Sequence, residues 1–233
     1  MAIKNLILTI AFSLFLITAL KAQRRESTGW LFLSTTKKIS EKYDFLSDVQ
    51  VRSADGFEYV NTLLLRGALS YNFSSKHSAA LGYAYKADWT YDKDIFSYSP
   101  EHRMYEQYLF NSELGKVEIN ARFRLEQRFV RKKEMVNFSQ RARAFLSAQI
   151  PLMAHPGFSK GIYAKIQNEV FLNVHNREKV NNSIFDQNRS SIGIGFRFSK
   201  SLDMDFGYLY WYQKEVEMDT RTNVFQLMLT SKF

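Results

Sequence analysis

The sequence predicts an all-β fold, a transmembrane antiparallel up-and-down β-barrel of 10 or 12 strands behind a cleaved signal peptide. Three observations predict it. Polarity alternates with period two in many stretches of roughly ten to fourteen residues. An apolar leader opens the chain, and an aromatic residue, Phe233, ends it. After Gly29 the chain has no useful segment with helical periodicity, and the whole sequence has only 3 prolines.

Residues 1–22 have the layout of a secretory signal peptide. Lys4 precedes an apolar run from Leu6 to Leu20, and Ala22 precedes Gln23. The alternative is a membrane-spanning helix, but about 15 apolar residues are fewer than the roughly 20 that cross a bilayer. We therefore expect a signal peptide over 1–22 and an outer-membrane β-barrel over 23–233.

Composition restricts the class of protein. With 0 cysteines, the chain forms no disulfide, no thiolate metal site and no lipidated N-terminal cysteine. The formal net charge is +9, with Lys4 and Lys21 in the leader. The arginines recur at period two inside strands and do not cluster on one segment, so a negatively charged membrane surface is a better partner than nucleic acid.

The stretch "VEINARFRLEQRFVR" shows the strand pattern most clearly. Its odd positions from 117 to 129 are mostly apolar, and the positions between them are polar or charged. Successive side chains of a strand point to opposite faces, so the segment has one apolar and one charged face. In a membrane barrel Phe123 and Leu125 face lipid, whereas Arg122 and Arg124 face the lumen.

Similar patterns predict strands along the chain. The segments are 30–37, 43–52, 60–73, 78–89, 102–114, 117–131, 138–150, 161–174, 188–199, 202–214 and 222–233. These are eleven, and a single-chain bacterial barrel with both ends in the periplasm has an even number. Either 30–37 is not a full wall strand, or a strand near the amino end has been missed. We therefore expect 10 or 12 strands.

The connections between predicted strands alternate in length. Short links are "SSK" (74–76), "GK" (115–116) and "KS" (200–201), and longer ones are "TYDKDIFSYSP", "KKEMVN", "HNREKVNNSIFD" and "KEVEMDTR". Membrane barrels have tight periplasmic turns and longer outer loops. A soluble barrel of the lipocalin kind is the alternative, with its apolar face inward and usually eight strands. Long strands and aromatic residues at strand ends, Tyr71, Phe73, Phe129, Tyr210 and Tyr212, favour the membrane.

The charged faces predict a lumen charge network across strands. Its members are Arg66, Arg103, Arg122, Arg124, Glu126, Arg128, Arg141, Arg143, Glu169, Arg189, Arg197, Asp203 and Asp205. The set contains both positive and negative side chains, so we expect ion pairs between them more than an electrostatic field of one sign. Two roles stay open: structural satisfaction of polar groups inside a narrow barrel, and conduction of small polar solutes.

Several short motifs carry a family resemblance. They are Trp30 near the mature start, Glu101 to Arg103 in "PEHRMYEQYLF", Arg122 to Arg128 in "ARFRLEQRF", Asp186 to Arg189 in "FDQNRSSIGIGFRFSK", and the terminal Phe233. In this order, together with "MDFGYLYWYQ" (204–213), they resemble a bacterial outer-membrane β-barrel family catalogued as a domain of unknown function. The resemblance implies a fold and a location, and no activity.

Catalytic and metal chemistry have little support in the sequence. His77 and His155 fall in predicted periplasmic turns, and His102 and His175 near the outer rim three strands apart, so we expect no metal site and no cofactor. Glu101 beside His102 is the strongest acid–base candidate. Neighbours on a strand point to opposite faces, so we assign no catalytic residue.

Three functions stay open. The first is a non-enzymatic barrel in the cell outer membrane, structural or passing small polar solutes through a charged lumen. The second is an outer-membrane enzyme acting on lipid or envelope glycan. The third is a surface interaction protein. Its basic outer residues, which also suit lipopolysaccharide phosphates, are Lys93, Arg131, Lys132, Lys133, Arg177 and Lys179. Expected partners are outer-membrane lipid, lipopolysaccharide and the barrel-assembly machinery. The terminal aromatic Phe233 resembles the signal that this machinery reads. Oligomeric state stays open.

Overall fold

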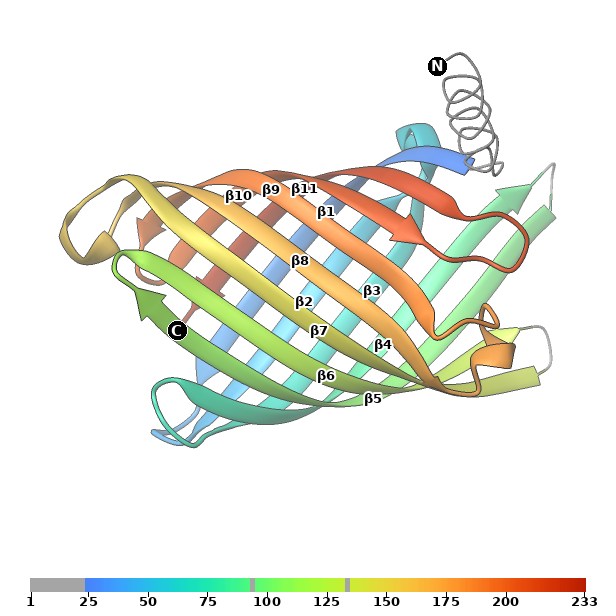
Figure 1. Cartoon of the computed structure of the whole chain (residues 1–233), viewed down its shortest axis with the longest axis horizontal. Coiled ribbons are helices and arrows are strands. Elements are labelled where there is room, and N and C mark those ends of the chain that lie inside the picture. The colour runs from blue at the N-terminus through green and yellow to red at the C-terminus, as the bar shows by residue number, and fades with distance from the viewer. Residues whose placement is uncertain (1–23, 93–94, 133–134) are drawn as a thin grey trace, which may run out of the picture.

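A computed structural model describes residues 24–92, 95–132 and 135–233. The predicted signal peptide, residues 1–22, and the basic residues Lys93 and Lys133 lie outside the described residues. The described chain forms one closed β-barrel of eleven strands (Figure 1). Each of the eleven predicted segments overlaps one of these strands.

The strands follow one another around the wall in chain order. They are β1 (Arg24–Lys38), β2 (Tyr43–Ser53), β3 (Val60–Asn72), β4 (His77–Asp92), β5 (Ile95–Leu114), β6 (Val117–Lys132), β7 (Met135–Ala154), β8 (Gly161–His175), β9 (Phe185–Ser199), β10 (Leu202–Gln213) and β11 (Thr220–Lys232). Three short 3₁₀ turns lie in the connections: η1 (Asp55–Phe57), η2 (Pro156–Phe158) and η3 (Arg177–Lys179). Among the described residues, no helix has the length and apolar character needed to cross a membrane.

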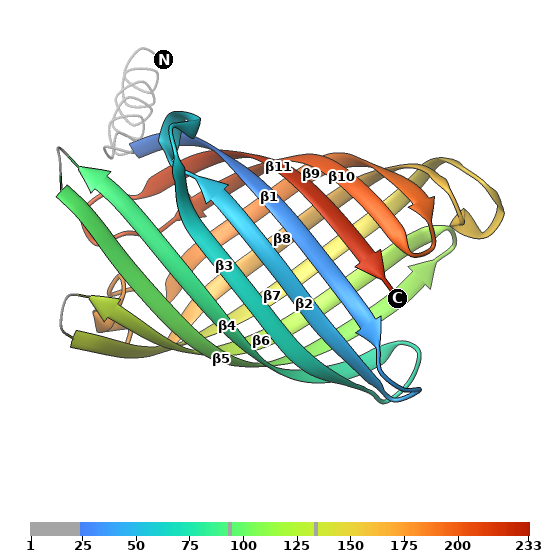
Figure 2. The same ribbon diagram turned by 180° about the vertical axis from the view of Figure 1, so that it is seen from behind.

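The barrel closes through a parallel pair of strands, so the prediction of 10 or 12 strands is wrong. Every consecutive pair is antiparallel, but β1 pairs with β11 in parallel, from Arg24 opposite Thr220 to Thr36 opposite Lys232 (Figure 2). The even-number rule assumes that both chain ends lie on the same side of the wall. Here Arg24 and Phe233 lie at opposite ends of the barrel. An odd number of strands then closes without a gap.

The segment 30–37 is a full wall strand, contrary to one of the two expectations. It lies within the 15 residues of β1, which pairs with β2 on one side and β11 on the other. No additional strand precedes β1 in the part of the chain that the structure describes. Alternating polarity reports the two faces of each strand and carries no information about the direction of the closing pair, so it could not give the number of strands.

The two ends of the barrel differ in their connections. At one end, which we call the turn end, the links are residues 39–42, 73–76, 115–116, 155–160 and 200–201. The other end, the loop end, holds the β2–β3, β4–β5, β6–β7, β8–β9 and β10–β11 connections. Two predicted loops, 90–100 and 132–137, are mostly strand. The β4–β5 hairpin continues as far as Asp92 opposite Ile95, where Tyr91 and Phe96 pack with ring centroids 5.3 Å apart.

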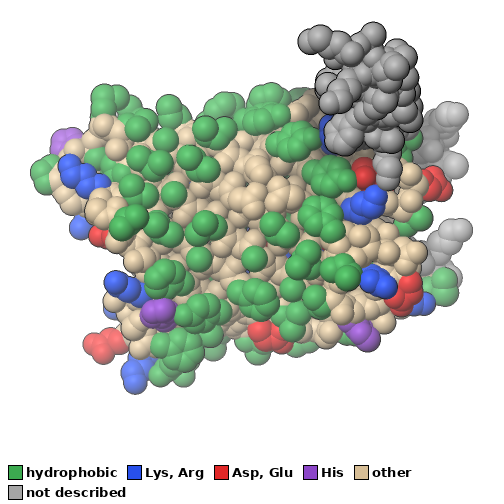
Figure 3. Space-filling view, in the orientation of Figure 1, with side chains coloured by type: hydrophobic (Ala, Val, Ile, Leu, Met, Phe, Trp, Pro, Cys, Tyr) green, Lys and Arg blue, Asp and Glu red, His purple; other side chains and the backbone are tan. Residues whose placement is uncertain are grey.

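The apolar faces of the strands point outward. Leu69, Phe123 and Phe206 are 50%, 54% and 60% exposed, while the alternating Arg66 and Arg124 are enclosed by the wall. Figure 3 shows hydrophobic side chains spread over the outer face of the barrel. This orientation is the reverse of the one that a lipocalin-like barrel requires.

Tyrosine rings fill part of the interior above glycines of the neighbouring strand. Tyr105 lies opposite Gly82, and Tyr163 lies opposite Gly195. A Cβ at Gly82 or Gly195 would stand 2.3 Å from the ring of the tyrosine. Both tyrosines are almost fully buried, so these two glycines provide the space for them.

The β2–β3 connection covers the loop-end part of β1. β1 pairs with β2 only from Trp30 onward, so the preceding residues have one edge without a strand partner. The backbone N–H of Ser27 donates to Asp55 Oδ1 at 2.7 Å, and that of Gly29 donates to Ser53 Oγ at 2.8 Å. These side chains satisfy donors that would otherwise be a free sheet edge.

Candidate functional site: the charged lumen

A large cavity lies inside the wall. Its volume is about 1150 Å³. Lys76 and Lys200 line it at the turn end, and Val180 and Gln213 line it at the loop end. The cavity therefore extends between the two ends of the barrel, and its lining residues come from the inward faces of the strands and from connections at both ends.

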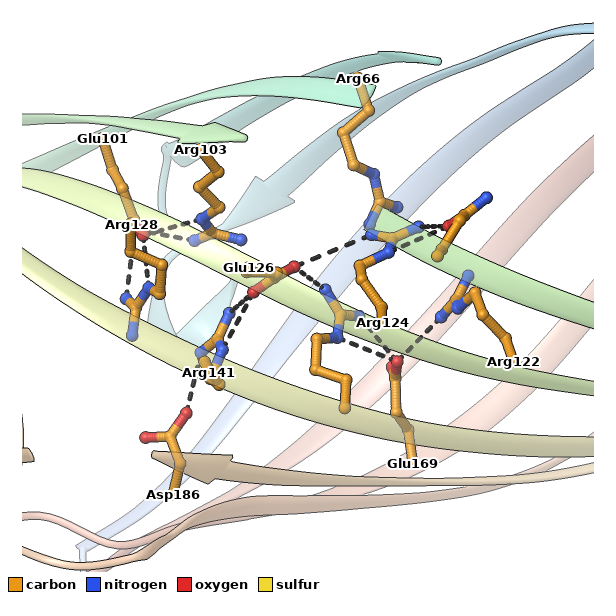
Figure 4. Close-up of polar contacts among 12 residues, drawn as sticks. Arg66, Glu101, Arg103, Arg122, Arg124, Glu126, Arg128, Arg141, Glu169 and Asp186 are labelled. Atoms are coloured by element: carbon orange, nitrogen blue, oxygen red, sulfur yellow. Dashed lines mark hydrogen bonds and ion pairs between the residues drawn. The ribbon is translucent and has the colours of Figure 1, made fainter. Parts of the chain in front are cut away.

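Glu126 on β6 is the centre of an ion-pair network on one side of the lumen (Figure 4). Its side chain is 1% exposed. The two guanidinium groups of the next strand bind it, with Arg141 Nη2 at 2.7 Å and Arg143 Nη1 at 2.5 Å. Arg124 is farther from Glu126, with its Nη1 atom 3.8 Å from the carboxylate. Its Nε and Nη2 atoms donate hydrogen bonds to the amide oxygen of Gln107. A buried carboxylate with several guanidinium donors has the partners that its burial requires.

The network continues to both sides through the same arginines. Arg141 Nη1 also donates to Asp186 Oδ2 at 2.8 Å, and Arg143 Nη2 donates to Glu169 Oε1 at 2.8 Å. Arg122 binds the same oxygen of Glu169 at 2.8 Å. Toward the loop end, Glu101 accepts hydrogen bonds from both Arg103 and Arg128 (Figure 4).

A second group of charges lies toward the turn end. Arg197 binds Glu118 at 2.6 Å and Asp203 at 2.8 Å. Its guanidinium carbon is 3.9 Å from the ring centroid of Phe158, which the β7–β8 turn buries there. Lys165 binds Asp205 at 3.1 Å. These contacts join the wall to the connection that covers part of this end.

The structure places the predicted network residues as follows. Most form ion pairs: Arg103, Arg122, Arg128, Arg141, Arg143, Glu126 and Glu169 along β5–β8, Arg197, Asp203 and Asp205 on β9–β10, and Arg66 with Asp48 at 2.8 Å. Arg124 has a glutamine amide as its closest acceptor. Arg189 lies opposite Glu169 in the β8–β9 register but forms no ion pair in the described structure, and its guanidinium lies over the aromatic rings of Trp30, Phe171 and Trp211.

Several lumen residues were not identified from the sequence. They are Asp48, Arg52, Lys86, Asp88, Glu118 and Lys165. The alternation rule provides a signal for some of them, since "DVQVR" places Asp48, Gln50 and Arg52 on the face opposite Val49 and Val51. Asp186 appeared only as part of a family motif, although it pairs with Arg141.

Glu101 and His102 point to opposite faces of β5. Glu101 is buried with its two arginines, whereas His102 is exposed and its Nδ1 lies 2.5 Å from the hydroxyl oxygen of Tyr83. The two side chains cannot act on one substrate as an acid–base pair. In the described part of the chain, no group of three or more His, Asp or Glu residues is arranged to hold a metal ion.

The closed wall, the inward charges and the outward apolar face define the class of protein as a β-barrel with a charged, ion-paired interior. The chain belongs to the family described as "Protein of unknown function (DUF2490)", whose model matches residues 27–222. The predicted resemblance to a barrel family of unknown function is thereby confirmed. No curated protein matches the chain, and no solved structure does.

Proposed function

We propose that this protein is an outer-membrane barrel that passes small polar solutes through its lumen. The membrane part of the proposal is supported by the exterior. Leucine, isoleucine and phenylalanine side chains are exposed around the wall, among them Leu33, Leu81, Leu146, Ile166, Ile194 and Leu227. A soluble monomer rarely exposes a continuous apolar surface of this extent, whereas a bilayer requires one.

Aromatic side chains near the strand ends also support a bilayer. Tyr43 and Phe73 are exposed at the turn end, and Tyr91, Phe96 and Tyr98 at the loop end. Tyrosine places its ring in the apolar layer and its hydroxyl at the headgroups. By analogy with other membrane barrels, the turn end would face the periplasm and the loop end the cell exterior.

The cavity is the observation that carries the solute-passing part. Its volume of about 1150 Å³ has room for tens of water molecules at about 30 Å³ each. The ion-paired residues Arg103, Arg122, Arg141 and Glu169 line this space and do not fill it. A purely structural network would need no continuous cavity from one end to the other.

Single-channel recording in planar bilayers tests the proposal. Residues 23–233 are refolded in detergent, and folding is verified by heat-modifiable migration on a gel. We expect discrete conductance steps from the folded protein and none from the heat-denatured sample. Folded protein that inserts without conducting would refute solute passage, and recovery of the mature protein in the soluble fraction of cells would refute the membrane location.

A further inference from the structure

Two tryptophans and two arginines form a cluster in the lumen beside the Glu126 network, where Arg189 lies opposite Glu169 in the β8–β9 register. We call Trp30, Arg52, Arg189 and Trp211 the Trp–Arg cluster. Trp30 on β1 lies opposite Arg52 on β2, and Arg189 on β9 lies opposite Trp211 on β10. The two indole rings meet edge to face with centroids 5.6 Å apart. Both cross-strand pairs thus converge on one place.

Both guanidinium groups lie on the same indole ring. The Cζ of Arg52 is 3.9 Å from the ring centroid of Trp30, and the Cζ of Arg189 is 5.1 Å from it. Arg189 is also 4.7 Å from the ring centroid of Trp211. Cation–π contacts orient the two guanidinium planes, but they do not neutralise two positive charges.

Neither arginine of the cluster forms an ion pair with a carboxylate among the described residues. Arg52 donates through Nη2 to the amide oxygen of Gln50 at 2.7 Å, and Arg189 donates through Nε to that of Gln187 at 3.1 Å. By contrast, Arg141 and Arg143 each bind two carboxylates. A guanidinium as buried as Arg52, which is 7% exposed, is costly without a counter-charge.

Two donors in the cluster have no acceptor. Arg52 Nε and the indole Nε1 of Trp211 are buried without a hydrogen-bond partner. Both groups can only donate, so they cannot satisfy each other or the other arginine. All four side chains of the cluster line the cavity. A negatively charged acceptor that enters through the lumen could accept hydrogen bonds from both donors.

We propose that the Trp–Arg cluster binds the oxyanion group of a small anionic solute, a phosphate or a carboxylate. This inference rests on the proposed function in one respect, because the solute must enter through the lumen. Several oxygens on one charged group can accept from both guanidinium forks and from the indole N–H. At the turn end, Lys76, Lys200 and Lys232 line the cavity and would attract an anion toward the cluster.

Tryptophan emission provides a direct binding assay. The chain has 3 tryptophans, and Trp89 on β4 is outside the cluster. Trp89→Phe leaves only the two cluster indoles as reporters. Folded Trp89→Phe protein in detergent is titrated with inorganic phosphate, with acetate and with glucose at constant ionic strength. We expect a saturable change in emission with phosphate or acetate, and none with glucose.

Variants assign the binding to the cluster. In the Trp89→Phe background, Arg52→Gln with Arg189→Gln should raise the apparent Kd at least tenfold. Arg25→Gln is the matched control, since Arg25 is an exposed β1 residue, and its Kd should stay unchanged. Heat-modifiable migration verifies that each variant is folded. If the double variant does not fold, Arg189→Lys carries the test, because it keeps the charge and loses the fork, and it should weaken binding.

The outcomes separate this inference from the proposed function. Absence of a saturable change with both anions, an equal response to glucose, or wild-type affinity in the folded arginine variants would overturn the anion site. Saturable anion binding by a protein that does not conduct would leave the site standing and remove solute passage. Conductance without saturable anion binding would refute the anion site and leave solute passage standing.

Discussion

Replacing Glu126 by glutamine removes the charge at the centre of the lumen network. The substitution keeps the shape and one acceptor oxygen, but it removes the charge and turns an amide donor toward either Arg141 or Arg143. Arg141 retains Asp186 and Arg143 retains Glu169, but Arg124 loses the one carboxylate within 4 Å of it in the described structure. Breaking a buried ion pair costs about 3–5 kcal/mol. Because two of the three arginines keep a partner, we expect the free energy of unfolding to fall by about 3 kcal/mol.

The measurement is unfolding in denaturant of detergent-folded protein, followed by tryptophan emission and by gel migration. A loss of about 3 kcal/mol changes the unfolding equilibrium constant by roughly 150-fold. Glu113→Gln is the matched control, because Glu113 lies on β5, is exposed and has no ion pair in the described structure. We expect its effect to stay within about 0.5 kcal/mol.

A double-mutant cycle tests the assignment to charge. Adding Arg124→Gln to Glu126→Gln removes the guanidinium that the first substitution leaves unbalanced. The combined loss should be smaller than the sum of the single losses by about 1 kcal/mol or more. If Glu126→Gln and Glu113→Gln destabilise equally, the network does not contribute to stability as the geometry implies, and the reasoning is refuted.

Three further predictions concern the packing of Tyr105 against Gly82, the turn end, and the parallel β1–β11 pair that closes the barrel. Gly82→Ala places a methyl group against the ring of Tyr105 and should lower the unfolding free energy by about 1–3 kcal/mol in the same denaturant assay. Phe158→Ala removes a ring buried at the turn end and lining the cavity, so single-channel conductance should rise. Epitope tags placed before Arg24 and after Phe233 should differ in their accessibility to antibody in intact cells. Only the first should be accessible, because the two tagged positions lie at opposite ends of the barrel and we propose that the loop end faces the cell exterior.

Each of these has a control or an opposing outcome. Gly67→Ala is the control for packing, since its methyl group would meet only the end of the Phe45 ring, at 3.3 Å, and should cost less than Gly82→Ala. Unchanged conductance in Phe158→Ala would mean that this ring does not narrow the path. Equal accessibility of both tags would contradict either the proposed outer-membrane location or the parallel pairing of β1 with β11.

Local periodicity was enough to predict the strands and the all-β barrel. Alternation acts over a few residues, and it located all eleven segments because each strand has one apolar and one polar face. It missed strand ends at the loop end, where charged residues such as Lys132 continue the β6–β7 hairpin opposite Met135. There the cross-strand partner, and not the local composition, keeps the backbone extended.

The partners in the lumen could not be predicted in the same way. Alternation places Arg122 and Glu169 on charged faces, but their contact joins positions 47 apart and depends on the stagger of β6, β7 and β8. The Trp–Arg cluster likewise combines residues from both sides of the seam, the parallel pairing of β1 with β11 that closes the barrel. Trp30 carried the family resemblance, and its contact with Arg189 requires the parallel closure that polarity does not encode.

The parallel seam has a consequence for the order of assembly. The hydroxyl groups of Thr35 and Ser231 lie 2.9 Å apart across it, although 196 positions separate them in the chain. Contacts at such separation form late, since the intervening chain must first be ordered. Until β11 is synthesised, β1 remains a strand with one open side, able to template a foreign peptide. A synthetic copy of β11 added during refolding should therefore occupy that side and trap the barrel unclosed.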